Sequence, residues 1–293
     1  MRRRLLLLSG CALAAILLTF LWPRDRGPKY QGKSLSAWLD VYFADSHDKS
    51  AAQQAAAADA VRHIGTNALP WLIKWLRSEP PAWRTKLEAA WRKLPDGIGN
   101  SGPILQRLAG KEPIYGDRAV QTFALFGESA SPMIPELSRL LRDPKPAVST
   151  RAAEALGCIG DQAMPALIAA LTDQRVSDRS VVAVQISFKQ ESGTNGVAAI
   201  AALTQCLKSK DPQLAFWAGH VLGRSWADRA LTIPVLIDGL SDPRPDVRAV
   251  CAESLGWPGE QSRQAVPSLT KALSDPDPGV RNAASEALRR IGP

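Results

Sequence analysis

Apolar residues recur along most of the chain with the period of an amphipathic helix. Within residues 247–255, apolar or small residues stand at steps of 3, 4, 7 and 8, which places them on one helical face. A glycine follows such a segment, and a proline then opens the next one, with leucines two and six residues further on. These prolines are Pro70, Pro165, Pro234 and Pro267. The pattern predicts short helices arranged in pairs.

The predicted helical pairs repeat at intervals in the thirties. Aspartates that precede the first helix of a pair are spaced by 30 to 38 residues. They are Asp143, Asp173, Asp211, Asp242 and Asp275. A helical repeat of this length is typical of a solenoid, in which stacked units bury a continuous core. We therefore expect an all-α fold, an α-solenoid (superhelix) of stacked antiparallel helix pairs, with about seven units.

The repeats resemble the HEAT-repeat family, in the bacterial form described as phycobilisome-lyase-like. The shared pattern is Asp-Pro…Val-Arg-x-x-Ala-Ala-x-Ala-Leu…Ile-Gly…Pro-x-Leu. It is clearest in residues 143–172 and 242–293, recognisable in 50–77 and 116–142, and degraded in 82–109 and 176–208. The resemblance implies a solenoid whose concave surface holds other macromolecules; a minority of relatives are enzymes or chromophore-lyase subunits. Ser149 departs from the pattern, because it stands where the repeat has arginine.

The N-terminal residues have a different character. From Leu5 to Trp22 the chain is uncharged and largely apolar, with arginines on both sides. As a helix these 18 residues would span about 27 Å, close to the thickness of a bilayer core. This predicts a signal-anchor helix and a membrane-anchored protein whose solenoid lies on the extracytoplasmic, periplasmic side. The alternatives are a lipoprotein via Cys11 and a secreted protein cleaved near residues 12–14.

Four segments are expected along the chain. Leu35, Trp38, Leu39 and Tyr42 follow helical spacing, so a capping helix precedes the repeats. The segments are the signal-anchor (1–23), a linker (24–33), the capping helix (34–49) and the HEAT-repeat solenoid (50–293).

The charge of the chain argues against nucleic-acid binding. The formal net charge is +8, yet residues 1–33 hold seven Lys/Arg and a single Asp. The remaining 260 residues carry 29 basic and 27 acidic side chains and are nearly neutral. A binder of phosphate backbones would need a positive surface there.

No motif for catalysis, a cofactor or a metal is expected. His47, His63 and His220 have no second histidine or carboxylate three or four residues further along the chain in a ligand arrangement. Residues 97–102 fit G-x-G-x-x-G, but they lie between helical segments and so indicate an inter-repeat loop. We therefore expect no enzyme, no catalytic residues and no metal or cofactor site.

Cysteines and repeat charges have structural interpretations. The cysteines after Cys11 form no C-x-x-C pair, and two of them, Cys206 and Cys251, align with small residues of other repeats, so they are expected as buried filler. They are Cys158, Cys206 and Cys251. The charged residues around the helix starts are expected to cap helices and to link repeats. They are Asp242, Arg248, Asp275 and Arg281.

Two tryptophans of the first repeat form the candidate binding site. Trp71 and Trp75 occupy positions that other repeats fill with mostly small residues. Either the capping helix covers them, through Trp38, Tyr42 and Phe43, or they form an exposed aromatic patch for a partner helix, a lipid head group or a glycan. The candidate binding residues are Trp71, Trp75, Arg62, Lys74 and Arg77.

Together these features predict a non-catalytic protein–protein interaction scaffold, anchored at the membrane. Its expected partner is another protein, associated with the cell envelope, and no nucleic acid. Two alternatives stay open: a chaperone or lyase-like subunit of an enzyme complex, and a nucleic-acid-binding HEAT-like protein.

Overall fold

A computed structural model describes residues 27–44, 50–78, 112–187, 194–224 and 228–292. The chain divides into two compact units, residues 1–71 and 72–293. The predicted signal-anchor, the Gly97–Gly102 loop and His47 lie outside the described residues.

The first unit contains a short hairpin and two helices. Strands β1 (Lys29–Tyr30) and β2 (Lys33–Ser34) pair antiparallel. Gln31 and Gly32 join them, both with positive φ, as a two-residue hairpin turn of this kind requires. Helices α2 (Leu35–Tyr42) and α3 (Ala51–Ile64) follow. The hairpin thus begins within residues 24–33, named above as a linker, and ends at Ser34, and α2 lies within residues 34–49.

Serines start both helices of this unit. The Ser34 side chain accepts a hydrogen bond from the backbone N–H of Ala37 at the start of α2. At α3, Ser50 and Gln53 form a reciprocal capping box. Gly65, with φ +63°, then ends α3 before a 3₁₀ turn, η1 (Gly65–Ala68). Helix α4 (Leu69–Leu76) continues into the second unit.

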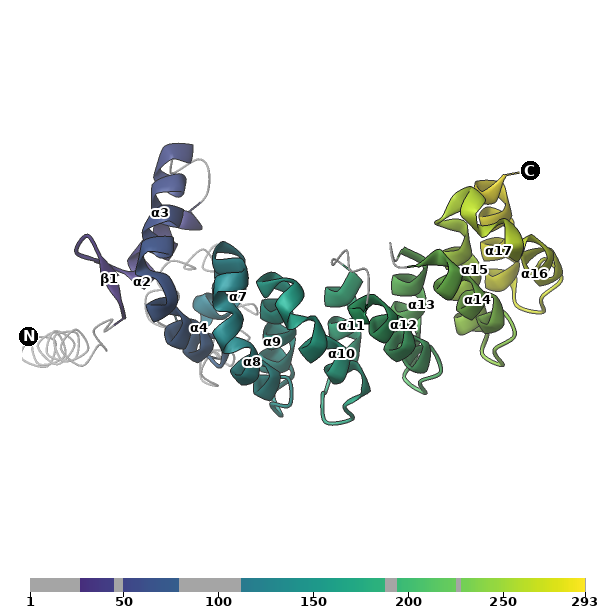
Figure 1. Cartoon of the computed structure of the whole chain (residues 1–293), viewed down its shortest axis with the longest axis horizontal. Coiled ribbons are helices and arrows are strands. Elements are labelled where there is room, and N and C mark those ends of the chain that lie inside the picture. Colours follow the sequence, from purple (N-terminus) through teal and green to yellow (C-terminus); the bar gives the residue numbers. More distant parts are fainter. Residues whose placement is uncertain (1–26, 45–49, 79–111, 188–193, 225–227, 293) are drawn as a thin grey trace, which may run out of the picture. The chain divides into compact units, whose positions relative to one another are not determined.

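The second unit is a stack of helices in two rows (Figure 1). The first row consists of α7 (Glu112–Phe126), α9 (Pro146–Ile159), α11 (Arg179–Ser187), α13 (Pro212–Arg224), α15 (Pro245–Gly256) and α17 (Pro278–Ile291). The second row consists of α8 (Ile134–Leu140), α10 (Met164–Thr172), α12 (Thr194–Leu207), α14 (Arg229–Gly239) and α16 (Val266–Ala272). Short 3₁₀ segments connect some pairs: η2 (Gly127–Met133), η3 (Asp161–Ala163) and η4 (Gly259–Ala265).

Contacts run from each repeat to the next. Within the first row, each helix packs on the following one, from α7 to α17. In the second row, α8 contacts α10, α10 contacts α12 and α12 contacts α14. This neighbour-to-neighbour packing confirms the predicted all-α solenoid.

The predicted apolar faces form the core. In α15, Val247, Val250, Cys251 and Leu255 are at most 2% exposed. In the second-row helix α10, Leu167 and Leu171 are fully buried, and a proline stands in the first turn as expected. Each helix therefore buries one face against its own partner and against the neighbouring repeat.

The predicted membrane location is contradicted. In the ranges given above, no helix combines the length and the apolar character needed to cross a bilayer. The longest of them, α7, has 15 residues and spans about 22 Å, whereas a bilayer core is about 30 Å thick. The prediction of a membrane-anchored solenoid on the periplasmic side is corrected by this finding.

Candidate functional site

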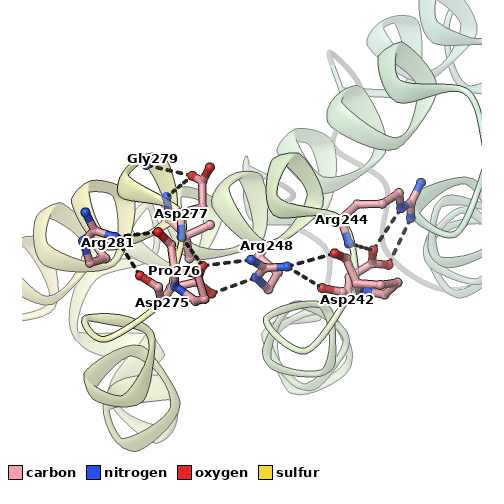
Figure 2. Close-up of polar contacts among 10 residues, drawn as sticks. Asp242, Arg244, Arg248, Asp275, Pro276, Asp277, Gly279 and Arg281 are labelled. Carbon is pink, nitrogen blue, oxygen red and sulfur yellow. Dashed lines mark hydrogen bonds and ion pairs between the residues drawn. The ribbon is translucent and has the colours of Figure 1, made fainter.

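Arginine and aspartate side chains link successive repeats in the second unit (Figure 2). Arg248 of α15 donates from Nε and Nη2 to the Asp275 carboxylate, both at 2.8 Å. Its Nη1 donates to the backbone oxygens of Asp242 and Pro243, at 2.9 and 3.1 Å. Arg281 of α17 repeats the arrangement one unit later, on the oxygens of Asp275 and Pro276. The Arg248–Asp275 pair confirms the predicted link between repeats, whereas Arg281 contacts the loop that opens its own repeat.

The same ion pairs shift the titration of their carboxylates. The hydrogen bonds from Arg248 lower the pKa of Asp275, and the pairing raises the pKa of Arg248. Arg244, which also donates to the backbone oxygens of Leu207 and Ser209, lowers the pKa of Asp242 in the same way. These shifts have a structural cause, since each carboxylate already holds a guanidinium.

Ser149 stands where the repeat has arginine, and its short side chain makes a different contact. Its buried hydroxyl donates to the backbone oxygen of Leu141 at 2.7 Å. Two residues on, Arg151 reaches back to two earlier segments: it donates to Asp117 of α7 at 2.8 Å and to the backbone oxygen of Ser78, just after α4, at 3.0 Å. The link between repeats is therefore kept at this position with different residues.

The candidate binding residues named from the sequence differ in exposure. Trp75 is only 5% exposed, and Trp71 is half-buried. Arg62 is exposed and pairs with Asp59 of its own helix at 2.8 Å. Lys74 is exposed, and Arg77 pairs with Glu136 of α8 at 2.5 Å. Little of the Trp75 ring is open to a ligand.

The aromatic residues of the first unit have internal partners. Trp38 is buried, donates from Nε1 to the backbone oxygen of Tyr30 at 3.0 Å, and lies under the Lys33 ammonium. The Tyr30 ring stacks on His63 with centroids 4.9 Å apart. His63 is thereby held by a ring contact rather than by metal-type ligands.

An aromatic cluster that the sequence analysis did not select lies near the end of the first row. We define this aromatic cluster as Phe216, Trp217 and His220 of α13 together with Trp257, which follows α15. The Phe216 and His220 rings are stacked with centroids 5.6 Å apart, and Trp257 meets His220 edge-on at 5.7 Å. Phe216 and Trp257 are each 42% exposed, although both are large and apolar.

Two arginines flank the exposed indole. The guanidinium carbon of Arg224 lies 5.1 Å from the Trp257 ring centroid, and that of Arg290 lies 5.3 Å from it. Arg224, Trp257 and Arg290 each stand two residues after a repeat leucine, so they occupy equivalent positions at or just after the ends of three successive first-row helices. Cation–π attraction is about 0.5–1 kcal/mol per contact at exposed sites, which helps to hold this row.

Small residues bring the three helices close enough for this contact. A Cβ atom added to Gly223 of α13 would lie 2.4 Å from the Cβ of Ser254, and one added to Gly256 of α15 would lie 2.9 Å from the Cα of Ala287. Side chains that follow these glycines therefore meet across the helix ends. Close backbone approach is the reason for glycine at both positions.

The polar groups around the cluster are few. Glu286 accepts hydrogen bonds from both Arg289 and Arg290, at 2.6 and 2.9 Å, which lowers its pKa to about 2. The Nδ1 atom of His220 is buried and has no hydrogen-bond partner in the described ranges. Among these same residues no group of His, Cys, Asp and Glu could hold a metal ion. The chemistry available here is apolar contact and positive charge.

The sequence contains a signal for this cluster. The buried face of α13 runs through Leu214, Ala215 and Ala218, and Phe216 stands off that face. A large aromatic residue on the polar side of a repeat helix, followed by Arg224 at the helix end, could have been selected as a surface feature. Contact with Trp257 could not, because it joins residues of different repeats.

Comparison with known proteins adds the family of the repeats. Residues 103–187 and 233–293 match HEAT repeats. No curated protein matches the chain. Similar solved structures include a designed armadillo repeat protein in complex with the peptide (KR)4, with 15% identity, a TM-score of 0.41, and coverage of 76% of this chain and 99% of that one.

Two further structures are similar at the same level. Human deoxyhypusine hydroxylase in complex with glycerol has 17% identity and a TM-score of 0.36, covering 88% of this chain and 95% of that one. An engineered protein has 15% identity and a TM-score of 0.39, covering 88% of this chain and 73% of that one. Nothing about ligand or activity follows from likeness at this level.

Proposed function

We propose that this chain, which carries HEAT repeats, is a non-catalytic scaffold that binds another protein. Stacked helical repeats of this kind present extended binding surfaces while each unit is stabilised by its neighbours. The single observation that carries the proposal is the exposed aromatic cluster beside Arg224 and Arg290. Tryptophan, tyrosine and arginine are the residues that most often dominate the binding energy of protein interfaces.

The titratable groups support a binding role over a catalytic one. The lowered carboxylate pKa values of Asp242, Asp275 and Glu286 come first from hydrogen bonds with arginines of the repeats. Burial raises the pKa of the Cys206 thiol to about 11 and that of Cys251 to about 12. A nucleophilic thiol would need the opposite shift and access to substrate.

The test is capture of the partner by the full-length protein. Cells that produce a tagged wild-type chain, a Trp257→Ala variant or a Leu273→Ala variant are mildly cross-linked, and captured proteins are identified by mass spectrometry. Leu273 is 40% exposed and lies outside the aromatic cluster, so it controls for loss of exposed apolar surface. We expect the wild-type chain and the Leu273→Ala variant to capture the same single protein reproducibly.

A non-catalytic scaffold must also leave the covalent structure of the captured protein unchanged. Incubation of the purified pair followed by intact-mass measurement is expected to give the starting masses. A covalent change in the partner would contradict the non-catalytic proposal, and so would capture of no protein by the wild-type chain. A partner enzyme whose own activity depends on this chain would favour the role of an enzyme-complex subunit instead.

A further inference from the structure

We infer that the row Arg224–Trp257–Arg290, with Phe216 beside it, binds an acidic peptide segment that carries an aromatic or large aliphatic side chain. This inference rests on the proposed scaffold function and names the chemistry of the bound segment. It concerns residues of α13, α15 and α17, which pack on one another in sequence (Figure 1).

The apolar part of the site calls for an apolar side chain. Phe216 and Trp257 each leave 42% of their surface open, and His220 lies in ring contact with both. The His220 ring fixes the spacing between the two exposed rings. Exposed aromatic rings held in this way form the rigid centre of many protein interfaces, because little side-chain freedom is lost on binding.

The charged part of the site selects carboxylates. Arg224 has no carboxylate partner among the residues that the structure describes, and it is exposed. Arg290 shares the single carboxylate of Glu286 with Arg289. Arg289 and Arg290 thus divide one carboxylate between them and Arg224 is exposed, so guanidinium N–H groups remain available along the row. An arginine near an aromatic ring still has N–H groups that can donate to a carboxylate.

The spacing of the arginines sets the length of the recognised segment. Both guanidinium carbons lie within 5.3 Å of one indole centroid, so they are at most about 10 Å apart, a distance spanned by about three residues of an extended chain. Two acidic side chains around one apolar side chain would fit this row. The backbone of such a segment could run across the ends of the three helices.

A peptide fits these observations better than a nucleic acid. Stacked aromatic rings and arginines also bind single-stranded bases, but such proteins add a positive groove that follows the phosphates. Here the charge of residues 34–293 is close to balanced. The arginines shown in Figure 2 already have carboxylate or backbone partners: Arg248 pairs with Asp275, and Arg244 pairs with Asp242.

The experiment measures binding of four fluorescent dodecapeptides to the full-length protein by anisotropy. Two peptides are rich in glutamate and two in lysine, and one of each pair has a central phenylalanine that the other replaces with serine. An oligothymidylate of 12 nucleotides is the fifth probe. We expect binding of the acidic peptide with phenylalanine, and weaker binding at higher salt, because the contact is partly electrostatic.

Variants assign the binding to the row. Trp257→Ala is expected to weaken binding of that peptide by about tenfold or more, and Arg224→Gln by about threefold. Lys271 lies on α16 and Leu273 directly follows it. Leu273→Ala and Lys271→Gln are the matched apolar and charge controls and are expected to leave affinity unchanged. Circular dichroism and melting temperature establish that each variant is folded; Arg224→Gln alters only an exposed side chain and keeps the test valid should Trp257→Ala unfold.

Three results would overturn the inference. In the first, the wild type fails to bind the acidic phenylalanine peptide; in the second, folded Trp257→Ala and Arg224→Gln bind that peptide as tightly as the wild type does; in the third, the wild type binds a lysine peptide or the oligothymidylate more tightly. The scaffold proposal fails separately, when the wild-type chain captures no protein. If the wild type and Trp257→Ala capture the same protein equally well, the scaffold stands and the assignment to this row falls.

Discussion

Gly256 of α15 lies so close to Ala287 of α17 that a Cβ atom at Gly256 would be 2.9 Å from the Ala287 Cα and 3.2 Å from its Cβ. The atoms in the way belong to backbone and to a methyl group, so neither can turn aside. The contact lies one residue before Trp257 and three residues before Arg290 in their respective helices. The close approach of α15 and α17 at Gly256 therefore also brings the side chains of Trp257 and Arg290 together.

Gly256→Ala is expected to destabilise the fold by about 1–3 kcal/mol, because the added methyl forces α15 and α17 apart. The matched control is Gly157→Ala, at the equivalent position in α9. There a Cβ meets only the flexible end of the Gln185 side chain, with the nearest atom its amide oxygen. The control should be neutral or stabilising by up to about 1 kcal/mol, since alanine favours a helix. Urea denaturation of both variants measures the difference; equal effects would contradict the close-packing argument.

Stability should fall in acid because the aspartates that pair with arginines at the starts of the repeats are held ionised. The folded-state pKa values of Asp242, Asp275 and Asp173 are lowered, first by side-chain hydrogen bonds from Arg244, Arg248 and Arg175. Their contribution is fully present above the unfolded pKa of about 4 and is lost as the pH falls below it. Denaturation midpoints measured from pH 7 to pH 2.5 should decline mainly below pH 4.

Asp275→Asn tests the origin of that decline. The variant loses the paired carboxylate, so its midpoint at pH 7 should be lower than that of wild type, and its further loss between pH 4 and pH 2.5 should be smaller. Asp228→Asn is a suitable control, since the Asp228 carboxylate caps α14 without an arginine partner in the ranges described. An identical acid profile for wild type and Asp275→Asn would remove this pair from the explanation.

Ser149→Ala is expected to destabilise the protein by about 1–3 kcal/mol. The substitution leaves the buried backbone oxygen of Leu141 without the hydroxyl that donates to it. Ser138→Ala provides the comparison, because the Ser138 hydroxyl donates to Ile134 within its own helix and is only part-buried. Thermal melts of the two variants should separate clearly. A loss no larger than that of Ser138→Ala would mean that Ser149 does not replace the repeat arginine in function.

The thiols should differ in reactivity. Burial raises the pKa of Cys206 to about 11 and of Cys251 to about 12, whereas Cys158 is half-buried. Since the thiolate is the reactive form, iodoacetamide at pH 8 should label Cys158 first, and Cys206 and Cys251 only on unfolding. Peptide mass spectrometry over a time course measures each site. Rapid labelling of Cys251 in the folded protein would contradict its place in the core.

The repeat pattern predicted the fold because each helix contains its own buried face. Val247, Val250, Cys251 and Leu255 point to one side of a single helix, and the local period is enough to identify that side. The roles of Arg248 and Asp275 also followed from the sequence, since they recur at fixed places in each unit. Sequence patterns within one repeat predict these contacts because each repeat of a solenoid contacts only its neighbours.

The candidate site was harder to predict because exposure depends on contacts between helices. Trp71 and Trp75 stand where small residues are common, yet Trp75 is buried. Trp257 was not selected, although its indole is exposed beside Arg224 and Arg290. The residues around Trp257 come from different helices, and the spacing of residues within one helix cannot predict contacts between helices. The turn at Gln31 and Gly32 was missed for a different reason: two-residue strands are too short to show alternation.

The central claim is that this chain holds a partner protein on the row Arg224–Trp257–Arg290, and amide hydrogen exchange tests it most directly. Exchange is compared between the free full-length protein and its complex with the captured partner. The claim predicts slower exchange in the helix ends that carry this row, within residues 212–224 and 250–257 and in residues 286–291. Protection confined to other repeats, or none at all in a complex that is shown to be intact, would contradict it.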